Sequence, residues 1–95
     1  MKKQEIENPA EELQQSVSDI FVELFETIDR NMFTNSEHIK ECVSEMNLRL
    51  KERKAITILQ KNVLLNLLNT NDNLIRRRAD LKRNFDYINS ITSNE

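Results

Sequence analysis

The stretch from Thr34 to Ile91 contains neither glycine nor proline, and its apolar residues recur at helical spacing almost throughout. Tight β-turns usually need Gly or Pro at special backbone angles, yet the whole chain of 95 residues has no Gly and one Pro. Charged residues make up 32% of the chain and aromatic residues 5%, which is typical of long helices with one apolar stripe. We therefore expect an all-α protein, either a helical hairpin or a two-helix rod with a long C-terminal coiled-coil helix.

A helix start is encoded near the N-terminus. Asn8 can act as the N-cap, Pro9 fits the first helical position, and Glu11 can reach back to the cap. We expect residues 1–7 to form a disordered, charged tail and residues 8–33 to form a first amphipathic helix. The apolar stripe of that helix comprises Leu13, Val17, Ile20, Phe21, Leu24, Phe25 and Ile28, with Phe21 and Phe25 as its main anchors.

The segment from Thr34 to Glu37 has the Thr-x-x-Glu spacing of a capping box, and Phe33 is placed to pack onto a new helix. We predict a short joint here, a second helix over residues 34–91 and a polar tail over residues 92–95. One continuous helix through the joint is the alternative, because Met32 extends the apolar stripe.

The second helix carries a seven-residue repeat. The charged run from Lys51 to Lys54 is interpreted as a solvated face, and the polar patch 69–73 as part of an unbroken helix because the repeat continues across it. Asn71 and Arg78 would then lie on the seam, where polar residues fix register and partner choice. The repeat consists of Leu67, Leu74, Leu81 and Ile88, with Leu64 and Phe85 on the companion line.

Such a helix is too long for the first helix to cover. At 1.5 Å per residue it would extend roughly 85 Å, and the apolar face over residues 56–68 is wider than a two-stranded seam needs. Other chains would have to cover the remainder, so we expect the chain on its own to be poorly soluble or to self-associate. The candidate partner-interface residues are Phe21, Phe25, Leu64, Leu67, Leu74, Leu81, Phe85 and Ile88.

The sequence contains no arrangement typical of catalysis. His38 and Cys42 lie four residues apart, but a zinc site needs four ligands and the chain has one His and one Cys. A phosphate-binding loop of the Gly-rich kind is excluded without Gly. We expect no enzyme, no metal, no cofactor and no small-molecule substrate, and we interpret Cys42 as a small apolar residue.

Nucleic acid and membranes are also disfavoured as partners. The formal net charge is -2, and the single basic cluster, from Arg76 to Arg78, lacks interleaved aromatic residues. No window approaches the ~20 apolar residues of a membrane span, and the N-terminal lysines precede no apolar run. One cysteine is consistent with a reducing compartment. From these residues we expect a soluble protein of the cytoplasm or the nucleus.

The chain contains several short blocks with a familiar spacing: Asp19-Ile20-Phe21, Ser36-Glu37 with Lys40, Met46-Asn47, and a terminal block of Ala79, Leu81, Asp86, Ile88, Asn89 and Ile91. These blocks resemble subunit two of the complex for biogenesis of lysosome-related organelles (BLOC). The resemblance covers roughly Ser18 to Ile91 and implies a cytosolic helical subunit of an elongated hetero-oligomer. Relatives of this kind act in trafficking from endosomes to lysosome-related organelles and in the related complex that couples lysosomes to kinesin.

The resemblance implies a non-catalytic scaffold at the cytosolic face of endosomes or lysosomes, where a long helix lies beside helices of other subunits. Two alternatives stay open. One is a small coiled-coil subunit of a kinetochore, spindle or transcriptional co-activator complex, since such subunits share this size, acidity and lack of Gly. The other is a free-standing helical hairpin or homodimer that binds one small target.

Overall fold

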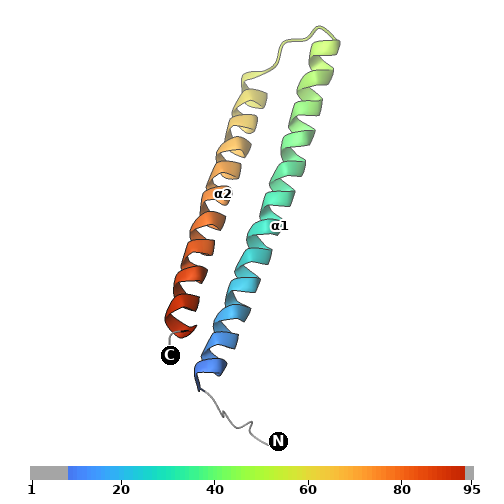
Figure 1. Ribbon diagram of the computed structural model, residues 1–95. Helices are drawn as coiled ribbons and strands as arrows, with labels where there is room; N and C mark the ends of the chain where they lie inside the picture. Colours follow the sequence, from blue (N-terminus) through green and yellow to red (C-terminus); the bar gives the residue numbers. More distant parts are fainter. Residues whose placement is uncertain (1–8, 94–95) are drawn as a thin grey trace, which may run out of the picture.

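The computed structural model describes residues 9–93 of the chain. It consists of two α-helices, α1 (Pro9–Lys51) and α2 (Ile58–Ser93), joined by the loop 52–57. The helices run antiparallel and side by side along the molecule (Figure 1), which confirms the expected all-α helical hairpin. The expected tail 1–7 and the last two residues, 94–95, lie outside the described residues.

The position of the turn differs from the prediction. Helix α1 begins at Pro9, as expected, but it continues through residues 30–37, so the predicted joint at Thr34 and the second helix over 34–91 are wrong. Asn35 lies on the face of α1 that meets α2, is only 7% exposed, and donates a hydrogen bond from Nδ2 to the carbonyl of Leu67 at 2.9 Å. The Thr-x-x-Glu segment remains helical because continuing the helix places Asn35 and the following apolar residues against α2.

The chain reverses instead at the charged run that was interpreted as a solvated helix face. Arg53 has a φ of 60°, the left-handed conformation that commonly ends a helix. The amide of Lys54 donates to the carbonyl of Arg49 at 2.8 Å, and that of Arg53 donates to Leu50 at 3.0 Å. These two bonds form a Schellman motif, which satisfies carbonyls at the end of α1. In a Schellman motif the left-handed position, here held by Arg53, is usually Gly.

Helix α2 begins with a capping box. The amide of Gln60 donates to Thr57 Oγ1 at 3.0 Å, and the amide of Thr57 donates to Gln60 Oε1, also at 3.0 Å, as the Thr-x-x-Gln spacing permits. The helix then continues without a break through the polar patch 69–73, as predicted. It includes Thr92, which was expected in the polar tail and is 9% exposed.

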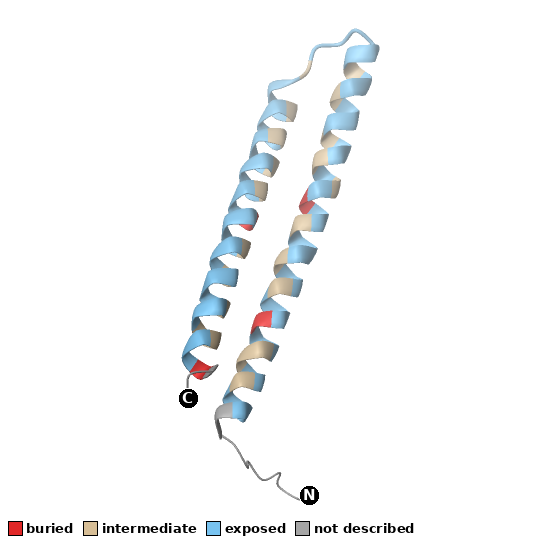
Figure 2. Cartoon of the chain, in the orientation of Figure 1, coloured by how far each residue is buried: buried red, intermediate tan, exposed pale blue. Residues whose placement is uncertain are grey.

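The core is one seam between the helices, which appears as the tan and red inner faces in Figure 2. Phe21 and Leu74 are its buried apolar residues, each 7% exposed, and within residues 11–92 no side chain is fully buried. The other seam residues are half-buried, apart from Asn35 and Thr92, and follow a heptad spacing. The seam consists of Phe21, Phe25, Ile28, Met32, Asn35, Ile39, Cys42 and Met46 of α1 with Gln60, Leu64, Leu67, Asn71, Leu74, Arg78, Leu81, Phe85, Ile88 and Thr92 of α2.

The hairpin is a rod with a high surface area. Its radius of gyration is 21.4 Å and its extents are 70 × 32 × 16 Å, whereas a compact domain of this length has a radius of gyration of about 12 Å. The molecule exposes 7905 Å², against about 5,700 Å² for a compact monomer of its mass. Two helices with one seam therefore leave much of the apolar surface uncovered.

Candidate protein-interaction surfaces

The eight predicted interface residues all lie on the seam inside the hairpin. Phe21 and Leu74 are buried, and the other six are half-buried. The seven-residue repeat thus defines a real contact face, but the helix that covers it belongs to the same chain. We expected other chains to cover the part of this stripe that lies beyond the first helix. For the seam this was wrong, because α1 is 43 residues long and lies beside α2 along its length.

An aromatic cluster packs between the helices in the half of the hairpin away from the loop. The rings of Phe21 and Phe85 lie 5.0 Å apart, and those of Phe25 and Phe85 lie 6.3 Å apart at 84°. These are the tilted and edge-on geometries that aromatic pairs prefer. The guanidinium of Arg78 lies 5.1 Å from the centre of the Phe25 ring, within range of a cation–π contact. These contacts hold the two helices in register here.

Arg78 also pairs with Asp29 across the seam. Its Nε donates to Asp29 Oδ1 at 2.7 Å and its Nη2 donates to Asp29 Oδ2 at 3.3 Å. Such a bidentate pair fixes the orientation of the guanidinium relative to the carboxylate. The hydrogen bond from Arg78 lowers the pKa of Asp29 and raises that of Arg78, while partial desolvation opposes both shifts. The pair therefore stabilises the hairpin above the usual pKa of Asp and loses its effect as the pH falls through the lowered value. Because both side chains are about half exposed, this effect is small.

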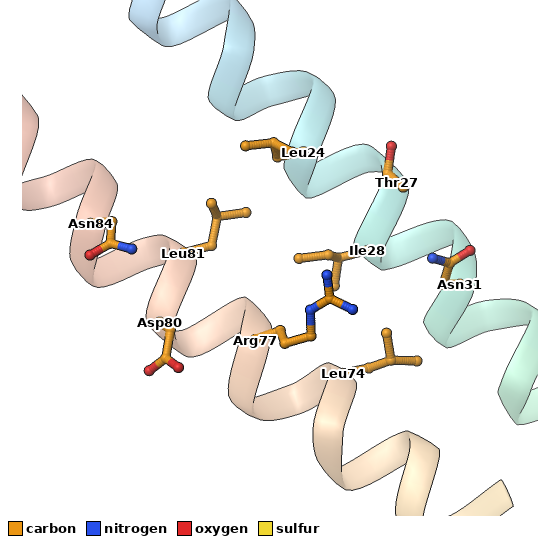
Figure 3. Close-up of a pocket in the computed structure, with 9 residues that line it drawn as sticks. All are labelled: Leu24, Thr27, Ile28, Asn31, Leu74, Arg77, Asp80, Leu81 and Asn84. Atoms are coloured by element: carbon orange, nitrogen blue, oxygen red, sulfur yellow. The ribbon is translucent and has the colours of Figure 1, made fainter.

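One flank of the seam has an open groove near the middle of the rod (Figure 3). Leu24 and Ile28 of α1 and Leu74 and Leu81 of α2 form its apolar lining, and Arg77 lies on its rim. Residues seven positions apart lie on the same edge of a helix. The residues in heptad phase with the groove therefore continue this side of the seam along both helices. We name it the Arg77 flank, and its exposed large apolar residues are Leu13, Ile20, Leu24, Leu48, Leu59, Val63, Tyr87 and Ile91.

The opposite flank has a second groove near the loop. It is lined by Val43, Ser44, Met46, Asn47, Leu50 and Leu64. We name this side the Lys61 flank, since Lys61 lies on the same edge of α2 as the two apolar residues Leu68 and Ile75. The exposed large apolar residues on the Lys61 flank are Val22, Phe33, Val43, Leu50, Ile58, Leu65, Leu68 and Ile75.

The sequence reasoning anticipated a further neighbouring helix over residues 56–68, where the apolar face is wide, but elsewhere it assigned interface roles to the seam alone. Each flank residue lies on an edge of the seam or about one helical turn from such an edge. The signal was present in apolar pairs seven residues apart but out of phase with the seam, such as Val43 with Leu50 and Leu68 with Ile75. A heptad that carries apolar residues at its edges as well as its centre is typical of helices with more than one neighbour.

The described residues contain little that resembles a reactive site. Cys42 is half-buried, and its Sγ lies 3.9 Å from Met46 Sδ and 3.9 Å from the carbonyl of Gln60. Between residues 9 and 93, no three His, Cys, Asp or Glu residues are grouped as metal ligands would be. Neither α1 nor α2 has a stretch apolar enough to cross a membrane.

The molecule is an antiparallel α-helical hairpin of the coiled-coil type, with two apolar flanks in addition to its internal seam. Comparisons with protein-family models, curated proteins and solved structures find no match to this chain. Its possible roles must therefore be argued from the surfaces themselves.

Proposed function

We propose that the chain is a non-catalytic helical scaffold subunit of a multi-subunit coiled-coil complex. The observation that carries this proposal is the pair of apolar flanks, which the hairpin cannot cover with its own residues. Large exposed apolar patches on soluble proteins usually mark interaction sites. Because the flanks lie on opposite sides of the seam, helices of other subunits can pack on both sides and extend the hairpin into a bundle.

The energetics favour helical partners. Full burial of one Leu or Ile side chain contributes about 1.5–3 kcal/mol, so a helix that covers only a few residues of one flank gains a substantial association energy. A third helix that packs beside α1 and α2 also continues the heptad spacing, since the flank residues repeat every seven positions. Partners with long amphipathic helices therefore fit these surfaces better than compact domains.

For the biological setting, we propose the role implied by the resemblance to subunit two of BLOC. The complex would act at the cytosolic face of endosomes or lysosomes, in organelle biogenesis and lysosome positioning. In this proposal Leu81 and Ile88 of the terminal block hold the hairpin closed, and Ile91, which is 47% exposed, contacts a neighbouring subunit.

The test is affinity purification of the tagged full-length chain, with identification of the proteins that copurify. We expect helical subunits of endosomal or lysosomal complexes. Two flank variants, Leu13→Gln/Ile20→Gln and Leu68→Gln/Ile75→Gln, should each lose partners, while circular dichroism shows that helicity is unchanged because these residues lie outside the seam. Asn62→Gln, on an exposed part of α2, is the matched control.

Two outcomes would contradict the proposal. Spindle, kinetochore or transcriptional partners would assign the chain to a different complex. Full retention of all partners by both flank variants would show that the flanks are not the binding surfaces.

A further inference from the structure

We propose that the Lys61 flank, in its half near the loop, binds an amphipathic helix whose apolar stripe is bordered by Asp and Glu. This inference rests on the proposed function and specifies the chemistry of one partner. It follows from the shape, the apolar character and the charge of this surface.

The shape of the surface suits a helix. The groove lined by Val43, Met46, Leu50 and Leu64 has a volume of about 360 Å³ and is open along one side. It lies beside the seam and receives residues from both α1 and α2, as the seat for a third helix in a bundle does. Leu68 and Ile75 continue the apolar surface along α2 in heptad steps.

The apolar residues here are well exposed. Leu50 is 56% exposed, Leu65 57% and Leu68 44%, so a helix packed against them would remove much apolar area from water. These residues come from both sides of the groove. An occupant with a single apolar stripe can therefore contact α1 and α2 at once.

The charge on this surface has one sign. Along the flank positions of residues 33–50 and 58–68, the ionisable residues are Lys40 and Lys61. The first carboxylates beyond them are Asp29 of α1, which is paired with Arg78, and Asp72 of α2. Lys61 forms no ion pair with any described residue, and Lys40 has one long, exposed contact with Glu37 at 3.4 Å. Carboxylates on the edges of an incoming helix would meet these lysines, whereas lysines on those edges would be repelled.

The rest of the rod has a different charge pattern. Helix α1 carries six carboxylates and no Lys or Arg between residues 11 and 29, so the half of the hairpin at the termini does not select acidic partners along α1. A lipid surface is disfavoured as the occupant because two lysines contribute only about 1 kcal/mol each to binding anionic lipid. The geometry points to an acidic helix near the loop.

The test uses two synthetic peptides of three heptads with the same Leu and Ala stripe. One has Glu at the flanking positions and the other has Lys. Fluorescence anisotropy with the full-length chain should show that the Glu peptide binds roughly tenfold more tightly, as expected for two or more ion pairs at the edge of an apolar contact. Lys40→Glu/Lys61→Glu should reverse this preference, and Leu68→Gln/Ile75→Gln should weaken binding of both peptides.

Arg30→Glu/Arg76→Glu, the same change of charge at two exposed positions outside this flank, is the matched control and should keep the preference for the Glu peptide. Equal binding of the two peptides, or a preference that survives the double lysine variant, would overturn the proposal. Binding to vesicles of anionic lipid in place of the peptides would also overturn it. So would a dimer of the chain that Leu68→Gln/Ile75→Gln dissociates, since a second copy would then occupy the flank.

Failure of this inference is distinguishable from failure of the proposed function. If the chain binds the Glu and Lys peptides equally well but the flank variants still lose their copurifying partners, the scaffold role stands and only the charge preference is wrong. If the peptides are discriminated but no helical partners copurify, the scaffold role is wrong.

Discussion

Arg53 ends helix α1 in a conformation that side chains with a Cβ usually avoid. Its φ of 60° places the Cβ close to the following carbonyl, a strain of roughly 1–2 kcal/mol for a non-Gly residue. The strain persists because the Schellman bonds of Arg53 and Lys54 and the bond from Arg49 Nε to the carbonyl of Ala55, at 2.9 Å, together determine the turn. A chain without Gly has to use another residue here.

Replacing Arg53 with Gly should stabilise the hairpin. The left-handed strain is relieved, and the entropic penalty of Gly in the unfolded chain offsets part of this gain, leaving about 0.5–1 kcal/mol. Urea denaturation followed by circular dichroism measures the change in the free energy of unfolding. Arg53→Ala, which keeps the Cβ, should show no such gain, and equal effects of Gly and Ala would contradict the strain argument.

At the scale of the helices, register along the seam is set by a small number of polar contacts. Most seam residues are apolar and tolerate sliding by a heptad, because the apolar pattern repeats every seven residues. Asn35 differs, since its amide bonds to Leu67 across the seam. Farther from the loop along the rod, the pair of Arg78 with Asp29 adds a second directional contact. Together these contacts favour one alignment of α1 with α2.

Asn35→Leu should leave the melting temperature equal or higher while broadening the range of assemblies that the chain forms. The carbonyl of Leu67 keeps its helical hydrogen bond, so loss of the cross-seam bond is offset by added apolar burial, with a net effect from zero to ~1 kcal/mol. Thermal melts and sedimentation velocity measure the two quantities. Asn62→Leu, at an exposed position on α2, is the control. A variant with a lower melting temperature and a single oligomeric state would contradict the register role.

The whole molecule is an incomplete bundle. Its two helices share one seam, and each apolar flank has one groove. The groove of the Arg77 flank lies near the middle of the rod, and that of the Lys61 flank lies near the loop. A free hairpin of this kind has a thin core, because Phe21 and Leu74 are the buried apolar residues of the described part. Association with other helices would therefore add much of its stability.

The purified chain should self-associate at micromolar concentration. Its exposed apolar residues have no cover within the hairpin, so sedimentation velocity should show species larger than the monomer. The fraction of these species should rise with protein concentration. It should also rise with added sulfate, because sulfate strengthens apolar contacts. The combined variant Leu13→Gln, Ile20→Gln and Leu24→Gln, which changes exposed residues of the Arg77 flank, should shift the population toward monomer while helicity is retained. A compact, cooperatively melting monomer of the unsubstituted chain would refute both this prediction and the assembly role.

The sequence alone determined that the protein is helical and which face of α2 is the seam. Both follow from local properties, since the lack of Gly disfavours tight turns and the seven-residue spacing from Leu64 to Ile88 places these side chains on one side of any helix. The capping signal at Asn8, Pro9 and Glu11 similarly marked Pro9 as the beginning of α1.

Only the tertiary structure decided where the chain reverses. The sequence has the spacing of a capping box both at Thr34 and at Thr57, and local capping energies of about 1 kcal/mol do not distinguish the two positions. A turn at Thr34 would leave more than half of the second helix uncovered, whereas a turn over 52–57 pairs helices of 43 and 36 residues along their whole length. Burial of apolar surface across the seam favours the second arrangement, and the same arrangement leaves the flank residues, rather than the seam, to face other molecules.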